Sequence, residues 1–377
     1  MKNMKHLYLP FVIVISFLLP FSAYSQKTGE NYYKKGTAKS IAGQYKEAIS
    51  DFDKAIKINS EDATYFFARA AAKNELEDYT GAIKDYTSAI ELKADYFEAY
   101  FYRAYIKDVL EDYDGAIKDY DKAIEINPDY LQAYHNRATA KDKKGDFSGA
   151  VEDYSRAILS KPDYFTYLHR GNSEYELKDY TGAIRDYDKA VEVNANDVEV
   201  YYLRGLAKNG LKNYEGAIKD FEKAIEFTPE DAKLYNAKAK SAIGMNDFKS
   251  AFHDLNYAIE LKWDYPESYF TRGFARNELE DYSLALLDFN KAIELKPDYY
   301  EAYNLRGEMK GKLNDFKGEL LDYDKAIELK PDFAEAYYNR GVAKTRTSDK
   351  DGACLDFNSS LKLGDSKAEE IIKEYCK

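Results

Sequence analysis

The chain of 377 residues repeats one short pattern of apolar and polar positions. Each copy holds two segments with apolar residues at helical spacing, divided by a turn that carries an aromatic residue. This aromatic recurs every 34 residues, with one step of 33 between Phe147 and Tyr180. A fixed period of this size predicts an all-α solenoid, in which copies of one helical unit stack. The turn position is held by Tyr45, Tyr79, Tyr113, Phe147, Tyr180, Tyr214, Phe248, Tyr282, Phe316 and, in the tenth copy, Lys350.

The third copy illustrates the two helices that we expect in each unit. Its spacing predicts a first helix from about Phe97 to Leu110 and a second helix that ends near Ile126. Asp112 precedes the second helix, where a carboxylate can accept hydrogen bonds from unpaired backbone N–H groups. Pro128 prevents the second helix from continuing. Each copy should therefore be an antiparallel helix pair with a short turn.

Two charged series run through the copies in parallel. The first helix carries arginine in eight copies and Lys35 and Lys238 in the other two, while the second helix carries aspartate in all ten. We expect these residues to pair between the two helices of each copy, and a partly buried pair of this kind specifies helix register more than it adds stability. A charged lining of a groove is the alternative. The arginines are Arg69, Arg103, Arg137, Arg170, Arg204, Arg272, Arg306 and Arg340.

Glycine recurs in the first turn of the second helix, although it costs about 1 kcal/mol there relative to alanine. We interpret this as a sign that a neighbouring helix approaches the backbone closely. The glycines are Gly81, Gly115, Gly149, Gly182, Gly216, Gly318 and Gly352.

The recurring residues resemble the tetratricopeptide repeat family. In the ninth copy the matching positions are Tyr303, Gly307, Phe316, Tyr323, Ala326 and Pro331. The resemblance extends over residues 29 to 367, as ten consecutive units. It implies a right-handed α-solenoid whose first helices line a concave face, and a binding or scaffolding role rather than an enzyme. The chain departs from the family pattern where the arginine series replaces a usual leucine.

The resemblance also implies which residues line the groove, namely those one, five and eight places after the first aromatic of each copy. Aromatic rings beside Asn and Asp can stack on side chains and hydrogen-bond an extended peptide. The alternative for each ring is packing against the next repeat. The lysines and asparagines that clamp a C-terminal carboxylate in some members are absent. The expected groove residues are Tyr33, Phe67, Asn74, Phe101, Tyr105, Asp108, His135, Asp142, Tyr175, Tyr202, Asn209, Phe270, Asn277 and Tyr338.

The first residues have the features of a secretory signal peptide. Lys2 and Lys5 precede an apolar run, and Ala23 and Ser25 give the small residues of a cleavage site. We expect residues 1–25 to be removed, which leaves a periplasmic or secreted protein without an integral membrane segment. An uncleaved anchor is the alternative, but the run is shorter than the roughly 20 residues that span a bilayer.

The other end of the chain is predicted to cap the solenoid. Residues 26–365 form the ten repeats, and residues 366–377 form a helix over the last apolar face. The two cysteines, Cys354 and Cys376, lie on either side of Gly364 and would meet in an antiparallel hairpin. In an exported protein this favours a disulfide, with two buried thiols as the alternative.

Two residues depart from the regular pattern. The sole tryptophan, Trp263, takes a position usually held by proline, and we expect it to fill space between repeats. Glu319 takes the place of a packing alanine, and an unpaired buried carboxylate is costly. The helix should therefore expose Glu319 or supply it with a partner.

Composition narrows the functional classes. The net charge of -12 and the pI near 5.1 argue against nucleic acid, which requires clustered Lys and Arg. The chain has four histidines, none in a metal-ligand spacing, and we find no nucleophile or phosphate-binding motif. We therefore expect no catalysis, metal or cofactor.

The first functional hypothesis is an exported scaffold that binds proteins or peptides in its concave groove. The second is an envelope protein that assembles with itself through its convex surface. The third is a carrier of a glycan or another ligand in the aromatic groove. The sequence identifies no partner.

Overall fold

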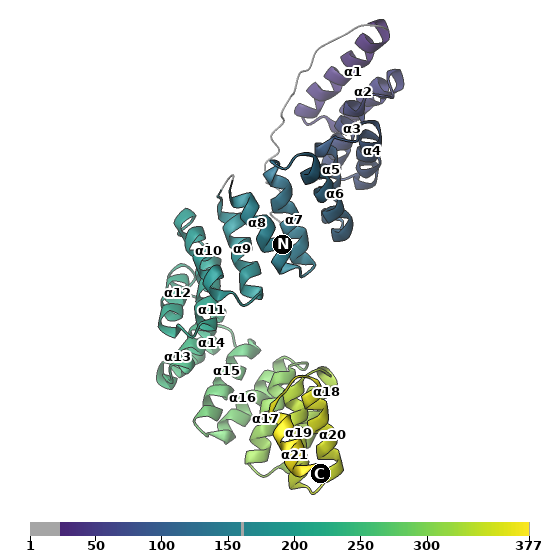
Figure 1. Cartoon of the computed structure of the whole chain (residues 1–377). Coiled ribbons are helices and arrows are strands. Elements are labelled where there is room, and N and C mark those ends of the chain that lie inside the picture. The colour runs from purple at the N-terminus through teal and green to yellow at the C-terminus, as the bar shows by residue number, and fades with distance from the viewer. Residues whose placement is uncertain (1–22, 160–161, 377) are drawn as a thin grey trace. The chain divides into compact units, whose positions relative to one another are not determined.

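The structure is a computed structural model that describes residues 23–159 and 162–376 (Figure 1). The predicted signal peptide lies outside these residues, except that residues 23–25 begin the first helix. The described residues are helices joined by turns, and they divide into two compact units, residues 23–159 and residues 162–376. The boundary falls where the period loses one residue.

The first unit contains four helix pairs. In each pair the first helix packs on the second, and the second packs on the first helix of the next pair. The first helices are α1 (Ala23–Ile41), α3 (Ala63–Glu75), α5 (Phe97–Val109) and α7 (Leu131–Lys143). The second helices are α2 (Tyr45–Ile58), α4 (Tyr79–Leu92), α6 (Tyr113–Ile126) and α8 (Phe147–Ile158).

The second unit continues the same alternation through six pairs and ends in one more helix. The first helices are α9 (Tyr164–Glu176), α11 (Val198–Gly210), α13 (Ala232–Gly244), α15 (Pro266–Glu278), α17 (Tyr300–Lys312) and α19 (Ala334–Arg346). The second helices are α10 (Tyr180–Val193), α12 (Tyr214–Phe227), α14 (Phe248–Leu261), α16 (Tyr282–Leu295), α18 (Phe316–Leu329) and α20 (Lys350–Lys362), and α21 (Lys367–Tyr375) follows.

The third pair confirms the sequence prediction. Helices α5 and α6 cover the predicted segments, and the Asp112 carboxylate accepts a hydrogen bond of 3.0 Å from the N–H of Gly115. Small and large residues alternate in the core, where Ala116, Tyr120 and Ala123 have no exposed surface. The fold is thus an all-α solenoid whose core consists of alanines packed against aromatic rings.

The predicted arginine–aspartate pairs are confirmed in eight copies. In the third copy, Nε and Nη2 of Arg103 each lie 2.7 Å from an oxygen of Asp119, which is 5% exposed. The first copy differs from the prediction, because Asp51 bonds Lys39 and Lys54 rather than Lys35. The pairs are Arg69–Asp85, Arg103–Asp119, Arg137–Asp153, Arg170–Asp186, Arg204–Asp220, Arg272–Asp288, Arg306–Asp322 and Arg340–Asp356.

In seven of the eight pairs, all except Arg170–Asp186, a second basic residue of the first helix extends the pair into a larger network that the sequence did not reveal. Lys107, one turn after Arg103, places Nζ 2.8 Å from Asp119, and Nη1 of Arg103 donates to Thr87 in the preceding repeat. One arginine therefore joins its own two helices to the helix before them. The arginines are half-buried, so the network lies at the seams of the solenoid and does not form an open charged groove.

The interpretation of the recurring glycines is wrong. A Cβ added to Gly115 would lie 2.1 Å from Oδ2 of Asp112, the residue that caps the same helix. The other glycines of the series are likewise closest to their own capping side chains. Glycine leaves room for the capping carboxylate, and a neighbouring helix is not the cause.

The structure also places the two irregular residues. Trp263 is 65% exposed in the turn before α15, so the prediction that it fills space between repeats is wrong. Glu319 is 1% exposed and lies 3.1 Å from Nη1 of Arg346, so the second of the two expected outcomes occurs. Gly311 leaves space for the carboxylate, since a Cβ there would lie 2.5 Å from Oε1.

Helix α21 covers the last repeat, where Ala368 packs with Ala353 and Phe357. Cys354 of α20 and Cys376, directly after α21, form a disulfide with their Cα atoms 5.7 Å apart. The bond closes a segment with a sequence separation of 22 and ties the last helix to the solenoid.

Candidate functional site

The expected groove residues one place after the first aromatic form a layer of rings packed on the second helices. Each ring contacts an aromatic of its own repeat, as Phe67 does with Tyr86 at 5.4 Å and Phe270 with Phe289 at 5.8 Å. Phe101 is 7% exposed, and the other rings of this layer are half-buried. They therefore contribute to the core as well as to a surface. The members are Tyr33, Phe67, Phe101, His135, Tyr202, Phe270 and Tyr338.

The residues five places after the first aromatic are more accessible. Tyr105 in α5 is 43% exposed and Phe274 in α15 is 37% exposed. The position is variable, with Ala71 in α3 and Lys240 in α13. Position five therefore presents both large rings and charged groups to solvent.

The polar residues eight places after the first aromatic are half-buried, and several bond other parts of the chain. Asp142 accepts a hydrogen bond of 2.9 Å from the hydroxyl of Tyr154, and Asp108 lies 3.4 Å from Nζ of Lys143. Asn209 accepts from Ser241, at 2.8 Å. The Tyr175 ring lies 5.4 Å from that of Tyr180, and Asn74 and Asn277 complete the set.

The structure distributes the expected residues over the two units, so we name two groove segments. The N-terminal groove segment contains Tyr33, Phe67, Asn74, Phe101, Tyr105, Asp108, His135 and Asp142. The C-terminal groove segment contains Tyr175, Tyr202, Asn209, Phe270, Asn277 and Tyr338. Neighbouring members within a segment are brought together, since Phe67 and Phe101 both contact the ring of Tyr102, at 5.7 and 5.2 Å.

A further set of aromatic residues belongs to these segments and was not predicted. Tyr96 precedes α5 and stacks on Phe67 at 4.9 Å, and Tyr130 contacts Phe101 at 4.9 Å. Tyr299 stacks on Phe270 at 4.8 Å. The signal was present in the sequence as an aromatic four places before the first aromatic of several copies.

The electrostatics of the segments differ from those of the helix-pairing network. Burial raises the pKa of Glu98 and of Asp108 in the first unit, and of Glu308 in the second unit. Lys240 is partly exposed, but the protein atoms around its ammonium group exclude water and lower its pKa. The negative charge of Glu267 acts in the opposite direction and raises that pKa. Asp108 is already paired with a lysine, whereas a buried carboxylate without such a partner is open to a cationic ligand.

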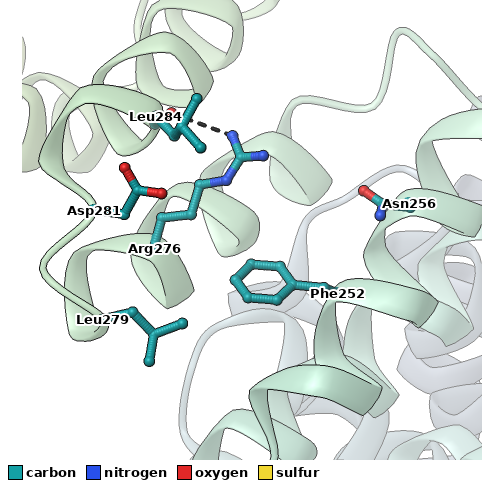
Figure 2. Close-up of a pocket in the computed structure, with 6 residues that line it drawn as sticks. All are labelled: Phe252, Asn256, Arg276, Leu279, Asp281 and Leu284. Atoms are coloured by element: carbon teal, nitrogen blue, oxygen red, sulfur yellow. Dashed lines mark hydrogen bonds between the residues drawn. The ribbon is translucent and has the colours of Figure 1, made fainter.

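A small depression of about 350 Å³ lies between α14 and α16 (Figure 2). Figure 2 shows the guanidinium of Arg276 close to Leu284, whose backbone oxygen accepts a hydrogen bond of 3.3 Å from it. The same guanidinium lies 2.7 Å from Asp288. Because its charge is already paired, we assign no ligand to this depression. Its lining is Phe252, Asn256, Arg276, Leu279, Asp281 and Leu284.

Among residues 23–159 and 162–376, no cluster of three or more His, Cys, Asp or Glu side chains is arranged to hold a metal ion. None of the helices in those ranges combines the length and the apolar character that crossing a membrane requires.

Comparison with known proteins identifies the repeats. Models described as tetratricopeptide repeat match residues 29–62, 97–130, 131–164, 198–231 and 266–299, and a model described as TPR repeat matches 171–210 and 312–347. Together these segments cover more than half of the chain. A search of curated proteins finds no match.

Solved structures with the same fold include yeast Tom70, which is 20% identical with a TM-score of 0.55, over 92% of this chain and 94% of that chain. The APC/C hetero-tetramer Cut9–Hcn1 is another, 12% identical with a TM-score of 0.53, over 93% of this chain and 91% of that chain. At these identities the likeness concerns the fold alone. The repeat matches and the fold together show that the chain belongs to the tetratricopeptide repeat family.

Proposed function

We propose that this chain is an exported scaffold that binds proteins or peptides along its first helices and has no catalytic role. The supporting observation is one exposed ring in each unit, Tyr105 in the first and Phe274 in the second, each in a segment with packed rings and half-buried Asn or Asp side chains. Rings of this kind stack on the side chains of an extended peptide, and the polar groups bond its backbone. Proteins of this family generally serve as interaction scaffolds.

The test uses these accessible rings. Phe67 and Phe101 also hold the repeats together, and truncating such buried rings costs about 3–5 kcal/mol, which would confuse binding with folding. We therefore compare the native chain with Tyr105→Ser and Phe274→Ser variants in a crosslinking pull-down from an extract of the exporting cells. Tyr257→Ser is the control, because Tyr257 is 39% exposed on the second helix α14 and belongs to neither groove segment.

A partner captured by the native chain and the control, and lost by the ring variants, supports groove binding. Equal capture by all four chains would move the binding surface away from the first helices.

Export is part of the same proposal. Lys2, Lys5 and the apolar run after them favour a signal peptide, and the Cys354–Cys376 disulfide suits an oxidising compartment. Sequencing the N-terminus of protein recovered outside the cytosol should give Gln26 as the first residue. An intact Met1 in the recovered protein would instead support an uncleaved anchor.

Self-association is a second candidate, favoured by one feature of the last three repeats. In these repeats the residue five places after the turn position is leucine. These residues, Leu287, Leu321 and Leu355, are 60%, 59% and 70% exposed. Other copies carry polar or charged residues there, such as Lys84 and Lys118. Large exposed apolar residues at the same position of three successive second helices favour a contact with a second copy of the chain.

The mass in solution tests this candidate. If the leucines join two copies, the mass of the native chain should rise with concentration, and changing all three to lysine should leave a monomer. A native chain that stays monomeric at high concentration excludes it.

A further inference from the structure

Glu98 is a half-buried carboxylate in the first turn of α5 that has no ion pair within 4.0 Å in the described part of its unit. Lys93 interacts with it only at longer range and lies over the ring of Tyr96, 4.6 Å from its centroid. Burial raises the pKa of Glu98, so its charged form lacks the solvation that water or a partner would supply. A cation beside it would remove this cost.

Three tyrosines lie near this carboxylate, and one of them, Tyr102, is four residues after Glu98 on the same face of α5. Burial raises the pKa of each tyrosine, and the nearby charge of Glu98 raises it further. Their rings are fixed by Phe67 and Phe101 of the predicted groove, and their hydroxyls have no hydrogen-bond partner in the described part of the unit. We call the carboxylate and these hydroxyls the Glu98 site, which comprises Glu98, Tyr96, Tyr102 and Tyr130.

The second unit contains the same arrangement with one addition. Glu267 stands where Glu98 does, two places before the first aromatic of its repeat, and Tyr265 and Tyr299 take the places of Tyr96 and Tyr130. After burial, Glu267 is again the main charge that raises the pKa of these two tyrosines. Here the chain places a lysine of its own near the carboxylate, because the charge of Glu267 raises the pKa of Lys240 against the larger effect of burial, although the two residues form no ion pair within 4.0 Å in the described part of the unit.

The first unit lacks this cation. Lys240 precedes Glu267 by 27 residues, and the residue that precedes Glu98 by 27 is Ala71. Ala71 is a small, uncharged residue at the repeat position that Lys240 occupies in the second unit. The repeat therefore keeps the acceptors of a lysine site and omits the lysine.

We propose that the Glu98 site binds the ammonium group of a lysine side chain on a peptide held in the N-terminal groove segment. An ammonium carries three donors, which the carboxylate and the phenol oxygens accept, and the apolar rings line the methylene stem. This inference rests on the proposed function, because it names a chemical feature of the peptide that the groove takes.

The probe is a fluorescein-labelled peptide, Gly-Ser-Lys-Ser-Lys-Ser-Gly, compared with the same peptide acetylated at both lysines, by fluorescence anisotropy with the full chain. The native chain should bind the lysine peptide about tenfold more tightly than the acetylated one. Glu98→Gln removes the acceptor charge, and Ala71→Lys fills the site from within. Each should reduce the preference to about twofold or less.

Glu199→Gln is the matched control, since Glu199 holds the same repeat position in the second unit and is exposed. It loses the same charge from the chain and should keep the tenfold preference. A native chain without the preference, or a Glu98→Gln variant that retains it, overturns the inference. Loss of the preference in Glu199→Gln would show an effect of net charge alone and would also overturn it. The pull-down with the ring variants tests groove binding independently, so either proposal can fail alone.

Discussion

Glu174 is the single residue that departs most from its counterparts in other copies. Most copies carry lysine or arginine there, such as Lys107 beside Asp119, whereas Glu174 places a carboxylate near Asp186. Glu174 is 6% exposed, and its Oε2 is buried without a hydrogen bond in the described structure. Burial, with a further contribution from Asp186, raises its pKa to about 7.

This shift predicts a pH-dependent stability. Because the folded pKa lies above the ordinary value of 4.5, the fold favours the protonated form, and this contribution falls as pH rises from 4.5 to 7. The full shift corresponds to about 3 kcal/mol. Glu174→Gln keeps the shape of the side chain and removes its charge. The urea midpoint of this variant should therefore exceed that of the native chain by more at pH 8 than at pH 5. Glu176→Gln, at an exposed neighbour, should show no such change. An equal difference at both pH values would contradict the buried charge.

Arg204 gives the second prediction at the residue scale. Its guanidinium bonds Asp220, which is 4% exposed, and also Asp188 of the preceding repeat. Arg204→Leu should cost about 3 kcal/mol, the lower end for breaking a buried pair, because Lys208 still contacts Asp220 at 2.7 Å. Urea denaturation measures the loss.

Two further variants separate the pair from simple packing. Asp220→Leu added to Arg204→Leu removes the second charge and should recover part of the stability. Lys223→Leu breaks the exposed pair with Glu226 and should cost less than about 1 kcal/mol. If Arg204→Leu costs no more than Lys223→Leu, the pair is not needed to hold the helices.

At the scale of one helix, the recurring glycine predicts an unusual response to alanine. Alanine is normally the better helix former by about 1 kcal/mol. In α6, however, a Cβ at residue 115 would lie 2.1 Å from Oδ2 of Asp112, so the carboxylate would have to shift within a cap that is worth about 1 kcal/mol. Gly115→Ala should therefore bring no gain in thermal stability. In an Asp112→Ala background, where no carboxylate is displaced, the same change should stabilise. The interpretation is wrong if Gly115→Ala has the same effect in both backgrounds.

Helices were the part of the structure that sequence predicted best. The expected Phe97–Leu110 helix corresponds to α5, and Asp112 caps α6 as expected, because spacing and capping are local properties of the chain. The reason for Gly115 was missed, since it depends on the rotamer of a capping side chain. The position of Trp263 was missed too, because an aromatic in a turn carries no period that indicates what covers it.

At the scale of the whole molecule, the candidate site was only partly accessible from sequence. The repeat register places Phe101 and Tyr105 on one face of their helix. It does not predict that the ring of Tyr130 packs against Phe101, whereas Tyr105 stays exposed. The difference in exposure between Phe101 and Tyr105 arises from packing between repeats, which brings together residues about 30 positions apart in the sequence. For the same reason Glu98 attracted no notice in the sequence, where it is one acidic residue among many.

The solenoid also predicts how the loss of the disulfide spreads through the molecule. Each helix packs mainly on its sequence neighbours, so α21 depends on α20 and on the Cys354–Cys376 bond. Replacing both cysteines by serine removes a constraint worth about 3 kcal/mol for a loop of this length. Hydrogen exchange should accelerate in α21 and at the end of α20, where Phe357 loses its cover, and remain unchanged in α9 to α16. Reducing the native chain with dithiothreitol should reproduce this pattern. Acceleration that reaches α9 would mean that the unit unfolds as one cooperative block, and unchanged exchange in α21 would mean that apolar packing alone holds the cap.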